Sequence, residues 1–211
     1  MPFRWIVREF LSTGLLSISI IGSAVFAENL TEDFGIRLLI NMLATVLMIF
    51  ILIAINTKDS QVDFNPIVTL LRVVNSEMSK RHASSRICFQ LLGAICGAGV
   101  VNLMFGNDLI TVSNVSRIGF PIALGEMIAT LGLLVISKSN DKNIGVIIPA
   151  WIGSAFFFTS STAFANPAIT IGRIFTDSFS GVSLNSVPYL IFGQFVALSL
   201  VVMSDKLRES S

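Results

Sequence analysis

The chain has 211 residues, of which 53% are hydrophobic and only 13% are charged, and its mean hydropathy is +0.81. These values lie outside the range of soluble globular proteins and within that of polytopic membrane proteins. The formal net charge is only +1 and the Lys and Arg residues are scattered, so no basic stripe is available for a nucleic acid partner.

Six segments are long and apolar enough to cross a hydrocarbon core of about 30 Å, which needs roughly twenty residues of helix. Their predicted bounds are Glu9 to Ala27, Ile36 to Ile55, Ile87 to Phe105, Phe120 to Ser137, Ile144 to Phe164 and Pro188 to Met203. Because five more spans follow the first, we interpret it as a membrane helix rather than as a cleavable signal peptide.

Basic residues are unevenly divided between the two sets of loops. One set holds Arg4, Arg8, Lys58, Arg72, Lys80, Arg81, Arg86, Lys138, Lys142, Lys206 and Arg208, and the other holds Arg37, Arg117 and Arg173. The positive-inside rule therefore predicts that both termini are cytoplasmic, and we expect the protein in a bacterial inner (plasma) membrane.

Two further segments begin with the dipeptide Asn-Pro, at Asn65 and at Asn166. Asn is a strong N-cap and Pro is favoured at the first helical position, so each pair predicts a helix that begins at the proline. The first, Pro66 to Val74, would be about 13 Å long, close to half of the hydrocarbon thickness. The loop charges place the two segments on opposite sides of the membrane, so two half-helices would meet near its centre with their positive N-termini together.

Other residue types recur in the same order in the two halves. Glu9 and Thr13 open the first half with the spacing Glu-x-x-x-Thr, Glu126 and Thr130 open the second half with the same spacing, and glutamines follow late in each half at 90 and 194. Such recurrence is typical of an inverted repeat with discontinuous helices at the midplane. We therefore predict an all-α polytopic membrane protein with six transmembrane helices and two re-entrant half-helices, in a single channel domain (1–211) with repeats of approximately 1–110 and 111–211.

Irregular backbone at that depth must line a polar path, because lipid offers it no hydrogen bonds. If each asparagine caps its half-helix through the side-chain oxygen, its NH2 group remains as a donor that faces the path. The positive helix ends would oppose cations and protons, so the path should pass neutral solutes. Alternatively, both asparagines cap helices in a sealed bundle.

These residues resemble the aquaporin and glycerol-facilitator family, the major intrinsic proteins, which carry an Asn-Pro-Ala motif in each half. The motifs here are Asn65-Pro66-Ile67 and Asn166-Pro167-Ala168. The resemblance implies a right-handed six-helix bundle with two half-helices, one pore per chain, no enzymatic activity, no cofactor and usually a homotetramer. Its expected partners are water, small neutral solutes and the lipid bilayer.

In that family, four positions form a constriction near the outer face, and one of them is an arginine directly after the second motif. Here that position is Ile169, and counting back from the asparagines without gaps gives Thr45, Ser154 and Ala163 for the other three. Family water channels commonly carry a bulky aromatic residue and a histidine at the first two positions. Their absence predicts a wider filter that admits larger neutral polyols or metalloid hydroxides. The residues after the second asparagine also resemble a bacterial subgroup associated with arsenic detoxification, which makes arsenous acid or methylated arsenic acids candidate solutes.

Three ionisable residues carry expected supporting roles. By resemblance, Glu9 and Glu126 accept hydrogen bonds from the backbone that leads into the half-helices, although Glu9 lies near the predicted membrane edge, where water could solvate it. Arg173 lies one helical turn after Ile169 and could either reach back toward the pore mouth, where it would replace the missing filter arginine, or face a loop carbonyl. We favour a structural role for it, because long cationic side chains near a membrane edge usually extend to water.

The remaining alternative is a poorly conducting protein of this fold with an assembly or adhesion role. The segment from Lys58 to Asp63 stands where the family usually has glycines, and Ile67 replaces the first motif alanine. Both changes could narrow the cytoplasmic half of the pore.

An intramembrane hydrolase is disfavoured, since the spans hold no Ser-His or paired-Asp arrangement. One histidine and two separated cysteines do not make a metal site.

Overall fold

The computed structural model describes residues 3–56, 62–139 and 141–209, so most of the segment from Lys58 to Asp63 lies outside the described residues. Within them, all regular secondary structure is helical. The elements are α1 (Phe3–Leu30), α2 (Phe34–Asn56), α3 (Pro66–Val74), α4 (Lys80–Met104), α5 (Phe120–Ser137), α6 (Ile144–Phe158), α7 (Pro167–Gly172), the 3-10 turns η1 (Arg173–Phe175) and η2 (Leu184–Ser186), and α8 (Val187–Glu209).

Five of the described helices, α1, α2, α4, α5 and α8, are long and apolar enough to cross a membrane. The fifth predicted span is shorter than expected: α6 has 15 residues, about 22 Å, and ends at Phe158 instead of Phe164. It ends there because Thr159 has extended backbone angles and the chain then reverses through left-handed residues at Thr162, Ala163 and Ala165. This reversal carries the chain back to Asn166, where α7 begins.

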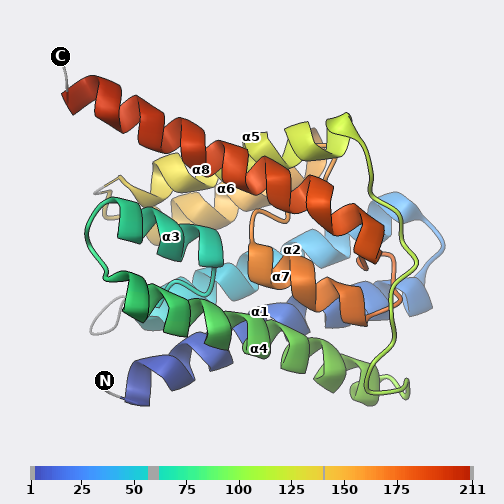
Figure 1. Cartoon of the computed structure of the whole chain (residues 1–211). Coiled ribbons are helices and arrows are strands. Elements are labelled where there is room, and N and C mark those ends of the chain that lie inside the picture. Colours follow the sequence, from blue (N-terminus) through green and yellow to red (C-terminus); the bar gives the residue numbers. More distant parts are fainter. Residues whose placement is uncertain (1–2, 57–61, 140, 210–211) are drawn as a thin grey trace.

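The helices form two matching pairs around the half-helices (Figure 1). The most extensive helix contacts join α1 to α4 and α5 to α8, and both α3 and α7 touch α4 and α8. The helix ends that carry the two termini lie on the same side of the molecule as α3, whereas the long connection from α4 to α5 runs over the opposite side. The half-helices α3 and α7 approach the middle from opposite directions, as the distribution of loop charges predicts.

Glycines allow the paired helices to approach closely. A Cβ atom added at Gly93 of α4 would lie 2.4 Å from the backbone oxygen of Phe10 in α1, and one added at Gly193 of α8 would lie 2.3 Å from that of Ala123 in α5. Small residues at a crossing are typical of membrane helices, whose association depends on close packing. The first close pair places α1, which carries Glu9, next to α4, which carries Gln90. The second places α5, which carries Glu126, next to α8, which carries Gln194.

We predict that Gly93→Ala destabilises the protein, because its methyl group would meet backbone that cannot move aside. Overpacking of this kind costs about 1–3 kcal/mol. Thermal unfolding in detergent, followed by circular dichroism, measures the change. The matched control is Gly22→Ala in α1, whose Cβ would meet only a Val101 methyl group at 3.7 Å and should not lower stability. Equal melting temperatures for the two variants would contradict this account of the crossing.

Candidate functional site

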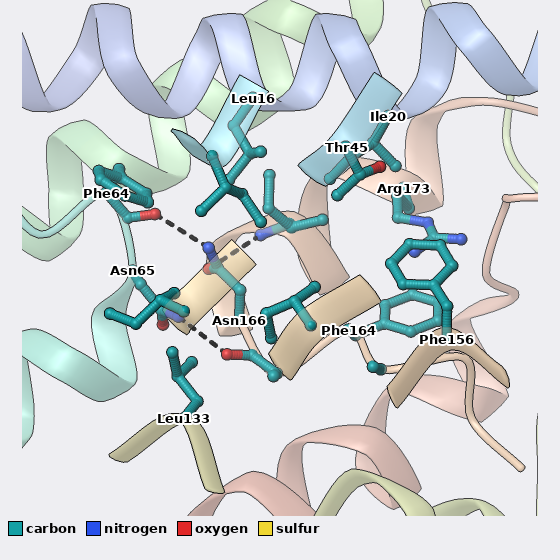
Figure 2. A pocket seen from close by; sticks show the side chains of 16 residues that line it. Leu16, Ile20, Thr45, Phe64, Asn65, Leu133, Phe156, Phe164, Asn166 and Arg173 are labelled. Carbon is teal, nitrogen blue, oxygen red and sulfur yellow. Dashed lines mark hydrogen bonds between the residues drawn. The ribbon is translucent and has the colours of Figure 1, made fainter. Parts of the chain in front are cut away.

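The two asparagines meet at the centre of the molecule and hold each other's loops (Figure 2). Asn65 Oδ1 accepts from the Ile67 N–H at 3.1 Å, and Asn166 Oδ1 accepts from the Ala168 N–H at 3.0 Å, so each asparagine caps its own half-helix. Each Nδ2 then donates across the centre, Asn65 to the Ala165 carbonyl at 2.8 Å and Asn166 to the corresponding carbonyl before the first motif at 2.9 Å. One N–H of each amide is therefore used in this exchange, and the other is left to face the path.

The residues just before the asparagines have unusual backbone conformations. Phe64 has φ of 36° and Ala165 has φ of 46°, in the left-handed region that non-glycine residues rarely adopt. These conformations turn each carbonyl toward the opposite asparagine and each N–H toward a buried carboxylate. The strain, of order 1–3 kcal/mol per residue, is held by those hydrogen bonds.

Glu9 supports the first half-helix. It is 0% exposed, so water does not solvate it, and its carboxylate accepts from the backbone N–H groups of Asp63 at 3.0 Å and Phe64 at 2.8 Å. Gln90 Nε2 donates to the same carboxylate at 2.9 Å and to the Thr69 hydroxyl at 3.0 Å, which ties α1, α3 and α4 together.

Glu126 repeats this arrangement in the second half. It is also 0% exposed and accepts from the N–H groups of Phe164 at 2.8 Å and Ala165 at 2.9 Å. Gln194 Nε2 donates to Glu126 at 2.7 Å and to the Thr170 hydroxyl at 3.2 Å. The order Glu, Asn-Pro, Gln noted in the sequence thus corresponds to two equivalent hydrogen-bond networks.

A narrow cavity of about 50 Å³ passes beside both asparagines. Since one water needs about 10–15 Å³ of such space, the cavity has room for only a few waters. Three of the four expected filter positions, Thr45, Ala163 and Ile169, line it. Apolar side chains form much of the remaining wall, and the described lining includes Leu16, Ile20, Ile49, Leu133, Ile148, Ile152 and Phe156.

Ser154 does not line this cavity, contrary to expectation. It is exposed, and its hydroxyl donates to the Ala150 carbonyl of its own helix at 2.9 Å. Ile152 and Phe156, two residues to either side, line the cavity instead. Side chains two positions apart on a helix point about 200° away from each other around its axis, so Ser154 faces away from the cavity. Counting without gaps therefore selected the wrong position in α6. The apolar sequence of α6 gave no signal for the correct face.

Arg173 lies in the cavity wall, so the expectation that its side chain extends to water was wrong, although it does contact a loop carbonyl. Its side chain lies beside Thr45 (Figure 2), the residue is 3% exposed, and the guanidinium carbon lies 3.7 Å from the centre of the Phe164 ring. Its Nε donates to the Ser180 carbonyl. Among the described residues, its two terminal nitrogens have no hydrogen-bond partner. The turn η1 continues α7 just far enough to direct Arg173 inward.

A wider cavity of about 650 Å³ adjoins the narrow one on the α3 side, and we call it the α3-side vestibule. The two cavities share the lining residues Phe64, Asn65, Leu133 and Ile148. The vestibule is also lined by Asp63 and Arg72, which sequence reasoning did not single out. Because of these shared residues, we interpret the two cavities as parts of one path from the side of Arg173, past both asparagines, to the α3 side.

Two comparisons with known proteins show the family, and a third shows the fold. The family model "Major intrinsic protein" matches residues 2–160. The aquaglyceroporin AqpS of Rhizobium meliloti (strain 1021) is 31% identical over 197 residues, which cover 92% of this chain and 84% of that protein. The X-ray structure of the aquaglyceroporin from Plasmodium falciparum matches with a TM-score of 0.68 at 20% identity, covering 93% of this chain and 92% of that chain.

The fold and the sequence match thus lead to one family. The described helices include five that can span a membrane, and an aquaporin fold accounts for their arrangement around two half-helices. The chain is an integral membrane protein of the major intrinsic protein family, whose aquaglyceroporins are channels and not enzymes.

Proposed function

We propose that the chain is a passive channel for water and small neutral hydroxylated solutes, such as glycerol-like polyols or metalloid acids including arsenous acid. The sequence predicted a wide filter without arginine, but Arg173 lines the narrow cavity, so we propose instead that it takes the place of the filter arginine that is absent at Ile169. The observation that carries this proposal is the buried Arg173 guanidinium in the wall of the narrow cavity, stacked on Phe164 with its terminal nitrogens unpartnered among the described residues.

The wall of the narrow cavity has a polar strip and an apolar remainder, which supports this solute class. The strip offers the free N–H of Asn65, that of Asn166 and the Arg173 guanidinium as donors, whereas the remainder is aliphatic or aromatic. A polyol can direct its oxygens to the strip and its carbon atoms to the apolar wall. A metalloid acid such as arsenous acid also has several hydroxyl oxygens that can accept from these donors. Inorganic cations cannot use the strip, because guanidinium and helix N-termini repel positive charge.

The similarity to AqpS of Rhizobium meliloti, named an aquaglyceroporin, favours glycerol among the candidate solutes.

We further propose a bacterial inner membrane location with both termini in the cytoplasm, which rests on the loop charges. A homotetramer with one pore per chain is proposed from the family alone. A single channel domain (1–211) with repeats of approximately 1–110 and 111–211 is supported by the two equivalent carboxylate networks.

The function can be tested in liposomes that contain the purified protein. After shrinkage in an impermeant sugar, we expect re-swelling in glycerol and in arsenous acid to be faster than in empty liposomes, because the path exposes donors to neutral hydroxylated solutes. The readout is stopped-flow light scattering. If no solute and no water crossed faster than in empty liposomes, the channel proposal would fail and a role in assembly or adhesion would take its place.

We predict that Arg173→Ala relaxes solute discrimination. Removing the guanidinium opens the cavity beside Thr45, so the ratio of re-swelling rates for a five-carbon polyol and glycerol should rise at least threefold. The matched control is Ser154→Ala, which removes a hydroxyl group outside the cavity and should leave the ratio unchanged. Melting temperatures of both variants show whether they are folded. An unaltered ratio in folded Arg173→Ala would rule out the assigned filter role.

A further inference from the structure

The repeat extends to an arginine at the end of each half-helix. Arg72 follows Asn65 by the same seven positions that separate Arg173 from Asn166. Arg72 lies in the last turn of α3 and Arg173 directly follows α7. A cation at either place is stabilised by the negative end of the helix dipole. Each also lines a cavity of the path, Arg72 in the α3-side vestibule and Arg173 in the narrow cavity. The path therefore has one arginine on each side of the asparagine pair.

The partners of the two arginines differ at one equivalent position. Two residues before the asparagine, the first half has Asp63 and the second half has Phe164. Arg72 Nη1 pairs with Asp63 Oδ1 at 3.0 Å, whereas Arg173 stacks on the Phe164 ring at 3.7 Å. A carboxylate cancels the charge of a guanidinium, but an aromatic ring leaves it in place.

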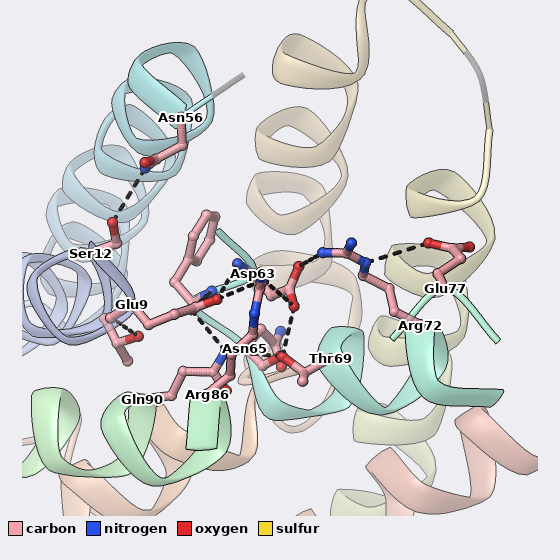
Figure 3. Close-up of polar contacts among 12 residues, drawn as sticks. Glu9, Ser12, Asn56, Asp63, Asn65, Thr69, Arg72, Glu77, Arg86 and Gln90 are labelled. Atoms are coloured by element: carbon pink, nitrogen blue, oxygen red, sulfur yellow. Dashed lines mark hydrogen bonds and ion pairs between the residues drawn. The ribbon is translucent and has the colours of Figure 1, made fainter. Parts of the chain in front are cut away.

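Asp63 is firmly held in this position (Figure 3). Its Oδ2 accepts from Arg86 Nη1 at 3.1 Å and from the Thr69 hydroxyl at 2.9 Å, and its side chain is only 5% exposed. Glu77 also pairs with Arg72, at 3.4 Å, but its side chain is 50% exposed. Water screens an exposed carboxylate strongly and a buried one weakly. Of the two described carboxylates that line the vestibule, Asp63 is therefore the one that water screens less.

Charges along the path are unequal at its two ends. Among the described residues that line the narrow cavity, Arg173 is the only ionisable one, and the two helix N-termini add positive potential there. The described ionisable residues of the vestibule are Asp63, Arg72, Glu77 and Lys138, two acids and two bases. An anion that enters at Arg173 therefore meets a positively charged lining as far as the asparagines, and Asp63 is the first carboxylate among the described residues that line the path.

We propose that the Asp63–Arg72 pair is a second selectivity site of the pore, in which Asp63 is the barrier to small inorganic anions. Arg173 and the N-termini of the half-helices exclude cations. Asp63 neutralises the charge of Arg72, so the positive potential of the narrow cavity does not continue through the vestibule. This inference rests on the proposed function, because it requires that the path conducts.

The test measures chloride and glycerol in liposomes of the same preparation. Chloride entry is followed by quenching of an entrapped fluorescent dye, with valinomycin and K⁺ to balance charge, and glycerol entry by re-swelling. Asp63→Asn keeps the shape of the side chain and can still accept from Thr69, while Arg86 retains its 3.0 Å pair with Glu9. We expect this variant to raise chloride entry at least tenfold over the wild type and to change glycerol entry less than twofold.

Two further variants separate the charge of Asp63 from its other contacts. Asp63→Asn combined with Arg72→Gln restores a neutral pair, so chloride entry should return to within twofold of the wild type. Glu77→Gln removes a carboxylate from the same arginine at the exposed rim and should also stay within twofold. If Asp63→Asn does not fold, Asp63→Ser makes the same charge change, and the tenfold rise is expected of it.

The outcomes also separate this inference from the proposed function. Unchanged chloride entry in a folded variant that still passes glycerol would overturn the anion barrier and leave the channel intact. Equal chloride leaks in Glu77→Gln and Asp63→Asn would overturn it as well. Absence of glycerol entry in the wild type would instead refute the channel itself.

Discussion

Two buried carboxylates and two asparagine amides hold the chain together at the depth where lipid offers no hydrogen bonds. Glu9 and Glu126 each accept from two consecutive backbone N–H groups, and each asparagine donates to a carbonyl of the opposite half. An unsatisfied backbone group in hydrocarbon costs several kcal/mol, so the reversal of the chain at this depth depends on these bonds. The same bonds position the remaining amide N–H groups toward the path. The two asparagines thus both hold the loops in place and line the cavity that solutes enter.

The two halves share this framework but differ in charge at one equivalent position. Asp63 turns the arginine at the end of α3 into an ion pair, and Phe164 leaves the arginine at the end of α7 charged. The distinction matters because the narrow cavity is small, so one guanidinium in its wall influences every solute that passes. The two halves thus have similar hydrogen-bond networks but different charges, so the arginine is paired with a carboxylate at one end of the path and stacked on an aromatic ring at the other.

Much of this arrangement could be predicted from the sequence. The Asn-Pro pairs predicted helix starts at Pro66 and Pro167, and both are confirmed, because capping is a local property of a few residues. The recurring glutamates and glutamines indicated equivalent halves for a similar reason, since their residue types and order are visible in the chain.

Other features depend on geometry that the sequence does not express. Ser154 was assigned by spacing, but the apolar sequence of α6 hides which face of that helix meets the cavity. Arg173 was expected to reach water, because the sequence gives no sign that η1 and the Phe164 ring would hold it inside. The equivalence of Arg72 and Arg173 was available as a repeated spacing of seven residues from each asparagine. Its significance depends on Asp63 and Phe164, whose contacts appear only in three dimensions.

Solutes that use the channel should pass beside Thr45 and the asparagine pair, and a reversible block at Thr45 tests this route. In a background with Cys88→Ser and Cys96→Ser, Thr45→Cys places a thiol in the narrow cavity, whereas Ser154→Cys places one outside it. Glycerol re-swelling of liposomes is measured before and after addition of mercuric chloride, and again after a reducing thiol. We expect mercury to abolish most of the glycerol entry through Thr45→Cys, reversibly, and to leave entry through Ser154→Cys unaffected. Unchanged glycerol entry through mercury-labelled Thr45→Cys would contradict this route.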